Sequence, residues 1–153
     1  MPGDISVNRK ALRDFFILER VEAGVELRGT EVKSIRAGFV NVSNAFARIE
    51  GEQAFLYDAD IQAYSKASHT QHEAKARRRL LLHKKEILHL QEATQIKGQT
   101  LVALRLYWKG HRVKVELGLG RGKEKSDQRQ DLKARTENRE AQREASRFNQ
   151  RHS

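Results

Sequence analysis

Three groups of residues have types and spacings that could support chemistry, and the first is GLGRGK at residues 118–123. A phosphate-binding Walker loop needs a glycine five residues before its Gly-Lys pair and a Ser or Thr after it. Leu117 and Glu124 occupy those two positions. The dinucleotide fingerprint also fails, because Lys123 stands where its third glycine should be. We interpret the segment as a flexible exit from a strand.

The second group is His69, His72 and Glu73, whose spacing would suit a metal ion. A closed metal site needs four positioned ligands, whereas these residues fall in SKASHTQHEAKARRR, which is typical of a polar loop. No Ser lies in a nucleophile-elbow motif. The sequence therefore predicts no metal site, no cofactor and no enzymatic activity. A metal-dependent nuclease or hydrolase using these residues stays open only as a third alternative.

The third group is basic. Thirty Lys and Arg stand against 20 Asp and Glu, a net charge of +10, and the pI of about 10.1 exceeds the value of about 9 that flags nucleic-acid binders. The cations gather at residues 8–13, at residues 75–85 and in the C-terminal tail. Each cluster alone could be a solubilising surface. Three clusters on one small domain favour RNA, because Lys and Arg release condensed counterions from a phosphate backbone.

Length and composition set the broad class. A chain of 153 residues predicts one folded domain, and the absence of Cys excludes disulfides and thiolate metal sites. No apolar run approaches the roughly 20 residues of a membrane span, and the N-terminus has no signal-peptide core. We expect a monomeric cytoplasmic protein with no membrane partner.

The predicted elements are mainly strands. Alternation of apolar and polar residues predicts a strand from Phe15 to Leu27 and two strands joined near Gly51. Residues 100–119 predict a hairpin turning at Lys109-Gly110. One face of its first strand would carry Val102, Leu104, Leu106 and Trp108, and one face of its second Val113, Val115, Leu117 and Leu119.

Two short helices complete the predicted domain. Residues 30–38 predict a helix capped by Thr30, and residues 83–98 predict one whose apolar stripe is Ile87, Leu90, Ala93 and Ile96. About five strands with two helices indicate an OB-like antiparallel barrel flanked by helices. A ferredoxin-like sheet ranks lower, because it would need more helix between the strands.

The domain boundary is predicted close to Gly120, giving an RNA-binding barrel at 1–119 and a basic tail at 120–153. Leu132 and Phe148 are the only large apolar residues of the tail, too few to offset the ordering cost of about 1–2 kcal/mol per residue. Arginine recurs every four residues from Arg135 to Arg151. We therefore expect a tail that is disordered when free and helical against phosphates, with a plain solubility tail as the alternative.

Five blocks of sequence carry a family resemblance: NRKA at 8–11, EAGVELRGTEVKSIRAG at 22–38, RRLLLHKKE at 78–86, LVALRLYWKGHRVKVELGL at 101–119 and GK..SDQRQDLKAR at 122–135. Together they resemble the SsrA-binding proteins, the SmpB family. The resemblance implies an OB-like barrel that binds transfer-messenger RNA. It implies a role in trans-translation, the rescue of ribosomes stalled at the end of a broken message. A structural ribosomal or general RNA-binding OB protein is the alternative.

The resemblance also implies site residues. The family's RNA-binding positions fall on Asn8, Glu22, Leu81 and Lys114, to which the basic clusters add Arg9, Lys10, Arg78, Arg79 and Lys84. The predicted strands place Glu22 and Lys114 on polar faces. A carboxylate there can accept hydrogen bonds from base amino groups. The alternative is that Glu22 is an ordinary exposed strand residue and Leu81 a core residue.

The tail is implied to enter the empty message channel near the ribosomal decoding centre. The implied ribosome-binding residues are Gly122, Lys123, Asp127, Arg129, Asp131, Lys133, Arg135 and Arg139. This chain departs from the family pattern at Glu124, Ser126 and Gln128, where the family has Lys, an aromatic residue or His, and Lys. These departures remove positive charge and a stacking group from the segment.

Overall fold

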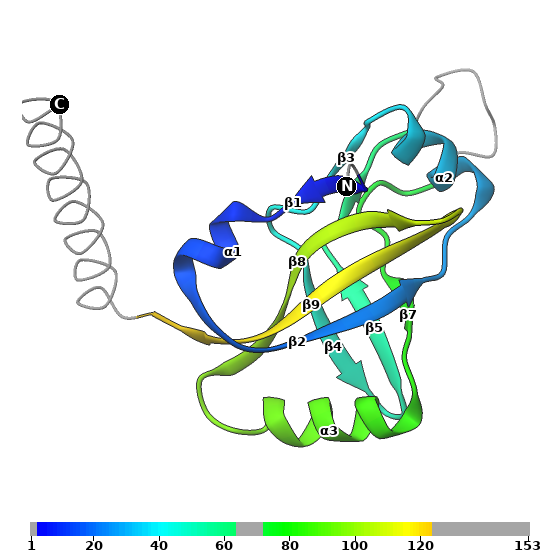
Figure 1. The fold of residues 1–153 in the computed structure, drawn as a ribbon. Helices are drawn as coiled ribbons and strands as arrows, with labels where there is room; N and C mark the ends of the chain where they lie inside the picture. Colours follow the sequence, from blue (N-terminus) through cyan, green and yellow to red (C-terminus); the bar gives the residue numbers. More distant parts are fainter. Residues whose placement is uncertain (1–2, 64–71, 124–153) are drawn as a thin grey trace, which may run out of the picture. The chain divides into compact units, whose positions relative to one another are not determined.

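The computed structural model describes residues 3–63 and 72–123. Within them the chain forms mainly strands, as predicted, with three short helices (Figure 1). The helices are α1 Arg9–Asp14, α2 Gly29–Arg36 and α3 Lys84–Thr94. The strands are β1 Asp4–Val7, β2 Phe15–Val25, β3 Val40–Asn41, β4 Phe46–Glu50, β5 Gln53–Tyr57, β6 Asp60–Ile61, β7 Arg78–Leu81, β8 Gln99–Lys109 and β9 Arg112–Gly122.

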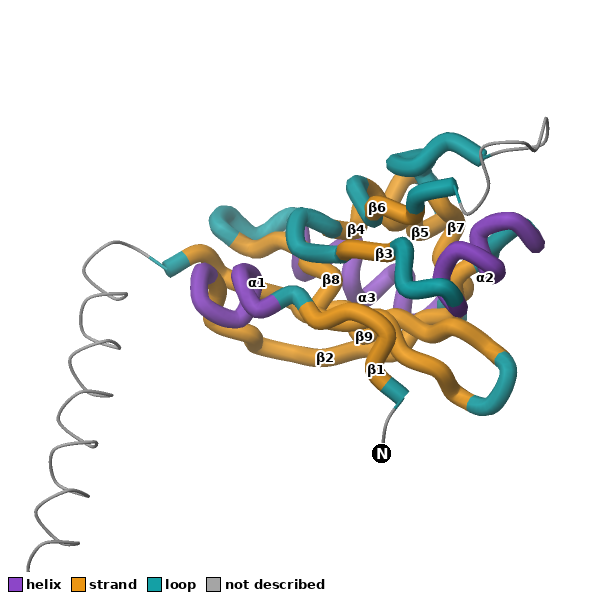
Figure 2. The backbone as a smooth tube through the Cα atoms, turned by 90° about the horizontal axis from the view of Figure 1, so that it is seen from above, coloured by secondary structure: helices purple, strands orange, loops and turns teal. Residues whose placement is uncertain are grey.

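The main sheet is antiparallel and its pairings close on themselves. β8 pairs with β4, β4 with β5, β5 with β7, β7 with β2, β2 with β9, and β9 again with β8. β1 adds to β8 outside this ring, and β3 pairs with β6 in a small separate sheet. Figures 1 and 2 show α1 and α2 near opposite ends of β2, and Figure 1 shows α3 across one end of the ring.

The core lies inside the ring. The predicted inward face of β9 is confirmed, because Val113, Val115, Leu117 and Leu119 all belong to the main buried cluster. Leu90 of α3 is fully buried against the same cluster, and the predicted stripe of α3 holds at Ile87 and Ala93. Its fourth member, Ile96, is exposed, because α3 ends at Thr94.

The predicted face of β8 is correct only in part, because Leu106 and Trp108 pack with the main core while Val102 and Leu104 do not. The register of β8 against β9 shifts between Ala103 and Arg105, which marks a bulge at Leu104. An extra residue reverses the alternation of side chains beyond it. Leu101, Ala103 and Leu106 therefore share the main core, whereas Val102 and Leu104 pack under α1 with Ala11.

The N-cap of α2 and the presence of α1 also differ from the prediction. Arg28, not Thr30, caps α2, and its backbone N–H donates to Glu31 Oε1 at 2.8 Å. The N-terminal helix α1 was not predicted. Its cap is Asn8, whose Oδ1 accepts from the backbone N–H of Ala11 at 3.0 Å. Such caps satisfy backbone donors that have no partner inside the helix.

The last strand runs past the predicted boundary. β9 continues to Gly122, and the compact unit formed by the strands ends at that residue. Asp127, Arg129, Asp131, Lys133, Arg135 and Arg139 lie outside the described residues. In the part of the chain that the structure describes, no helix combines the length and apolarity needed to cross a membrane.

Candidate nucleic-acid interface

Three predicted site residues come together on one outer face of the ring. Gly24 of β2 pairs with Leu81 of β7 on one side and with Lys114 of β9 on the other. Directly paired residues of neighbouring strands point to the same face, and Glu22, two positions before Gly24, shares that face. The structure thus brings Glu22, Leu81 and Lys114 into one row.

A groove runs over this row, with a volume of about 410 Å³. Its walls carry three cations, Arg79, Arg112 and Lys114, and three carboxylates, Glu22, Glu52 and Glu86. Gly24 forms part of the floor. A Cβ at this position would lie 3.3 Å from Leu81 Cβ and 3.6 Å from Lys114 Nζ. The missing side chain of Gly24 therefore keeps the space between Leu81 and Lys114 open.

Glu22 is fixed by two donors. The hydroxyl of Tyr107 donates to Oε2, and Lys109 Nζ donates to Oε1 at 3.0 Å. These hydrogen bonds, Tyr107 first, hold the pKa of Glu22 below its ordinary value. Burial and the bond to Glu22 raise the pKa of Tyr107. The carboxylate stays ionised and its side chain is 40% exposed, so its remaining lone pairs can accept hydrogen bonds from a ligand.

Leu81 is exposed, not a core residue. It keeps 52% of its surface accessible, while its neighbour Leu80 is buried. An apolar side chain beside exposed cations offers a van der Waals contact for a base, while the cations can pair with the phosphates of the same RNA. Arg79, next along β7, lies on the groove wall with its side chain 51% exposed and 3.9 Å from Glu26.

Arg78 occupies a structural position. It is 3% exposed, and its Nε donates to the Glu31 carboxylate. Nη1 donates to the carbonyl of Ala59 at 2.7 Å, and Nη2 to those of Ala74 and Glu73 at 3.0 and 3.3 Å. This guanidinium joins β7 to α2 inside the protein. It has no surface for RNA, so we remove Arg78 from the predicted RNA-binding set.

The side chain of Asn8 also makes its hydrogen bonds inside the protein. It is 2% exposed, and its Nδ2 donates to the carbonyl of Ala103 at 2.8 Å while Oδ1 caps α1. Its side chain therefore orients α1 and does not reach a ligand in this conformation. We correct its predicted role from a direct RNA contact to a residue that positions α1.

The remaining predicted cations are exposed but dispersed. Arg9 and Lys10 lie on α1, where Lys10 lines a separate hollow with Phe46 and Val102. Lys84 is the first residue of α3 and is exposed. Gly122 ends β9 and Lys123 follows it. These residues surround the ring and do not line the groove.

His72 lies in the predicted loop, between β6 and β7, but it is buried and has a structural role. Its Nε2 donates to the carbonyl of Ile61 at 2.6 Å, so Nδ1 accepts from the Thr30 hydroxyl at 3.0 Å. Both ring nitrogens are occupied. His69 lies outside the described residues, and among those described no group of three His, Asp or Glu could hold a metal ion.

Sequence reasoning missed two groove residues, Gly24 and Arg112, and the two donors to Glu22, Tyr107 and Lys109. The signal for Tyr107, Lys109 and Arg112 lay in the hairpin. The turn falls at Gly110-His111, with Gly110 at a φ of +63°, so Lys109 pairs with Arg112 and Tyr107 with Lys114. Counting outward from the turn would have placed Tyr107 beside Lys114. No local sequence pattern identifies Gly24 as a groove residue.

The closed strand ring and its open groove of cations and carboxylates define a small antiparallel β protein of the RNA-binding class. The model of the family described as SmpB protein matches residues 5–147. The chain belongs to the SmpB protein family, which confirms the resemblance seen in the sequence.

Curated relatives and a solved structure support the same family assignment. The chain is 49% identical to an SsrA-binding protein of Carboxydothermus hydrogenoformans, over 89% of this chain and 91% of the relative. It is 43% identical to one of Streptomyces coelicolor, over 91% and 87%. A chain from the structure described as "tmRNA-SmpB: a journey to the center of the bacterial ribosome" superposes with a TM-score of 0.66 at 41% identity, covering 82% of this chain and 92% of that one.

Proposed function

We propose that this protein binds the tRNA-like part of transfer-messenger RNA and delivers it to stalled ribosomes for trans-translation. The relatives carry the name SsrA-binding protein, and the superposed structure is of a transfer-messenger RNA complex with SmpB. The observation that carries the proposal is the row of Glu22, Leu81 and Lys114 from three strands on one open face. The protein acts as an adaptor without turnover of its own.

Different side chains of the groove can contact the phosphates, the sugars and the bases of an RNA loop. Lys114, Arg79 and Arg112 supply cations for phosphates, which position the RNA without reading its sequence. Glu22 accepts from base amino groups or a ribose 2′-hydroxyl, a feature absent from DNA. Leu81 gives an unpaired base an apolar contact. The open floor at Gly24 lets the RNA approach the backbone of β2.

The basic tail is proposed to act on the ribosome, in the cytoplasm where ribosomes translate. Because the tail has many charged and few apolar residues, it cannot form a core of its own and needs an external partner to fold. The phosphates of ribosomal RNA would be such a partner. In this proposal the groove selects transfer-messenger RNA, and the tail enters the vacant message channel near the decoding centre.

Equilibrium binding of the tRNA-like domain at one fixed salt concentration tests the groove. Glu22→Ala should weaken binding by more than the effect of a substitution on a solvated surface, about 0.5 kcal/mol. Glu92→Ala on the exposed side of α3 removes the same charge outside the groove and is the matched control. Equal affinities for the two variants would contradict the assignment of the groove.

Deletion of residues 124–153 separates the two parts of the proposal. It leaves β9 complete, so binding of the tRNA-like domain should stay near that of the full chain, while peptide tagging on stalled ribosomes is lost. Loss of both activities together would contradict the division of roles. Stoichiometric presence of the full chain in idle ribosomes would instead support a structural ribosomal protein.

A further inference from the structure

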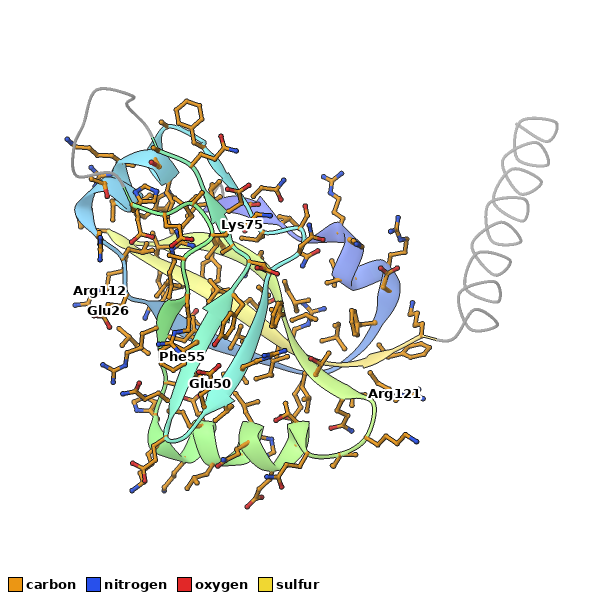
Figure 3. All side chains as sticks on the ribbon, turned by 180° about the vertical axis from the view of Figure 1, so that it is seen from behind. Glu26, Glu50, Phe55, Lys75, Arg112 and Arg121 are labelled. Carbon is orange, nitrogen blue, oxygen red and sulfur yellow. The ribbon has the colours of Figure 1, made fainter. Side chains whose placement is uncertain are left out.

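A second group of stacked aromatic rings and arginines lies on the strands next to the row of Glu22, Leu81 and Lys114, where Phe55 pairs with Arg79 of the groove wall. Its members come from β4, β5 and the residue before β7, and we call it the arginine–aromatic face: Phe46, Arg48, Phe55, Tyr57 and Arg77. Figure 3 shows this side of the ring toward the viewer, with Phe55 and Glu50 labelled. Nothing in the proposed function uses these residues.

The face is ordered by direct contacts. Phe46 pairs with Tyr57 across β4 and β5, and their rings stack with centroids 5.4 Å apart and planes 11° from parallel. The Arg48 guanidinium lies over both rings, 5.3 Å from the Phe46 centroid and 5.7 Å from that of Tyr57. The Arg77 guanidinium lies 4.0 Å from the Phe55 centroid and donates to Glu50 at 3.0 Å.

These rings are not needed to fill the core. The alternate residues of the same strands, Ala47, Ala54 and Leu56, point inward and are buried. The three aromatic rings are only half-buried, and Arg48 and Arg77 are exposed. A guanidinium stacked on a ring keeps its outer plane free for a base. Arg77 gives one edge N–H to Glu50, and its remaining N–H groups can donate to phosphate oxygens.

A hollow of about 610 Å³ lies beside Phe55 and Arg77. Its wall holds Arg28, Arg77, Arg78 and Arg79 against Glu26, Glu31 and Glu73. Arg78 pairs with Glu31 and Arg77 with Glu50, so Arg28 and Arg79 face Glu26 and Glu73 in this wall. The hollow therefore combines both signs of charge, and its volume falls within the range of about 300–1,000 Å³ typical of small-ligand sites.

We propose that the arginine–aromatic face binds a second RNA segment through its unpaired bases, separately from the groove. Stacking planes combined with cations are the features by which proteins bind single strands without reading sequence. An acidic peptide would use the charges but not the stacked planes. Arg79 lines both the groove and the hollow, so the two RNA segments would pass on either side of β7.

Fluorescence anisotropy of the full-length protein with a labelled 12-nucleotide oligouridine tests this proposal. The double variant Arg48→Ala/Arg77→Ala should bind about tenfold more weakly. Lys33→Ala/Lys97→Ala removes the same charge at two exposed positions outside both surfaces and should bind within about twofold of wild type. Equal losses in the two double variants would mean general charge attraction and would overturn the proposal.

The conservative variant Arg48→Lys/Arg77→Lys separates stacking from charge. It keeps both cations but loses the planar guanidinium groups, so its affinity should fall below that of wild type. Crosslinking with a 5-iodouridine oligomer should map to Phe55 or Tyr57. Wild-type affinity in the lysine variant, or crosslinks confined to the groove, would contradict base stacking on this face.

A final measurement tests whether the two surfaces are separate. Oligouridine should still bind when the tRNA-like domain of transfer-messenger RNA is saturating, and Arg48→Ala/Arg77→Ala should leave binding of that domain unchanged. Competitive displacement would show one shared site and overturn the proposal. Failure of the tRNA-like domain to bind at all would contradict the proposed function instead, because the oligouridine comparison does not depend on it.

Discussion

The hydroxyl of Tyr107 on β8 donates a hydrogen bond to the carboxylate of Glu22 on β2, across the intervening strand β9. This contact fixes the position of the Glu22 carboxylate in a groove that presents both cations and carboxylates to a ligand. It also shifts the two pKa values in opposite directions, lowering that of Glu22 and raising that of Tyr107. Tyr107 therefore positions Glu22 in the groove.

Tyr107→Phe should weaken binding of the tRNA-like domain without unfolding the protein. The ring remains, but Glu22 loses the donor that orients it, and we expect a loss of about three- to tenfold in affinity. Fluorescence anisotropy measures the affinity, and circular dichroism checks the fold. In the double variant with Glu22→Ala the two effects should not add, because both act through the same carboxylate; full additivity would contradict a positioning role.

The pKa of Glu22 should respond to the same substitution. The folded value is depressed, so the stabilisation from Glu22 is present above its ordinary pKa of 4.5 and is lost as pH falls through the lowered value. Tyr107→Phe removes the largest cause of the depression and should raise the pKa of Glu22 toward 4.5. Carbon-detected NMR titration of the Glu22 carboxyl measures it. An unchanged pKa would mean that the hydrogen bond from Tyr107 does not lower the pKa of Glu22 and that Lys109 does so alone.

Arg78→Ala should strongly destabilise the fold. The substitution leaves the buried Glu31 carboxylate without its charged partner, and breaking a buried pair in this way costs about 3–5 kcal/mol. It also removes a donor from the carbonyls of Ala59, Glu73 and Ala74, of which the last two keep backbone donors. Denaturant unfolding measures the free energy. Arg77→Ala, next in the chain but in an exposed ion pair, should cost no more than about 1 kcal/mol. Similar losses for both would contradict the structural role of Arg78.

Gly24→Val should block the groove. Its Cβ would stand 3.3 Å from Leu81 Cβ, and the added methyl groups would fill the space beside Lys114. We expect at least about a tenfold loss of affinity for the tRNA-like domain, equal to about 1.4 kcal/mol. Gly29→Ala is the control, since nothing lies within 4 Å of its Cβ position. Retained affinity in a folded Gly24→Val protein would exclude close approach of RNA at this point.

Alternation of apolar and polar residues predicts the inward face of β9, but β7 has no such alternation. In β7, Arg78 and Leu80 are buried while Arg79 and Leu81 are exposed. The letters RRLL contain no signal for that choice, because a run of arginines followed by a run of leucines has no polar–apolar alternation. The choice follows from pairing with β5 and β2 and from the buried carboxylate of Glu31.

The sequence determined the chain's family, its mainly β class, the inward face of β9 and the anionic character of its ligand, because each depends on local pattern or on composition. Tertiary structure alone decided the rest: the bulge at Leu104, the burial of Arg78 and Asn8, and the meeting of Glu22, Leu81 and Lys114. The physical reason is that hydrogen bonding between strands distant in the chain sets their register and closes the ring. Register determines which side chains become neighbours.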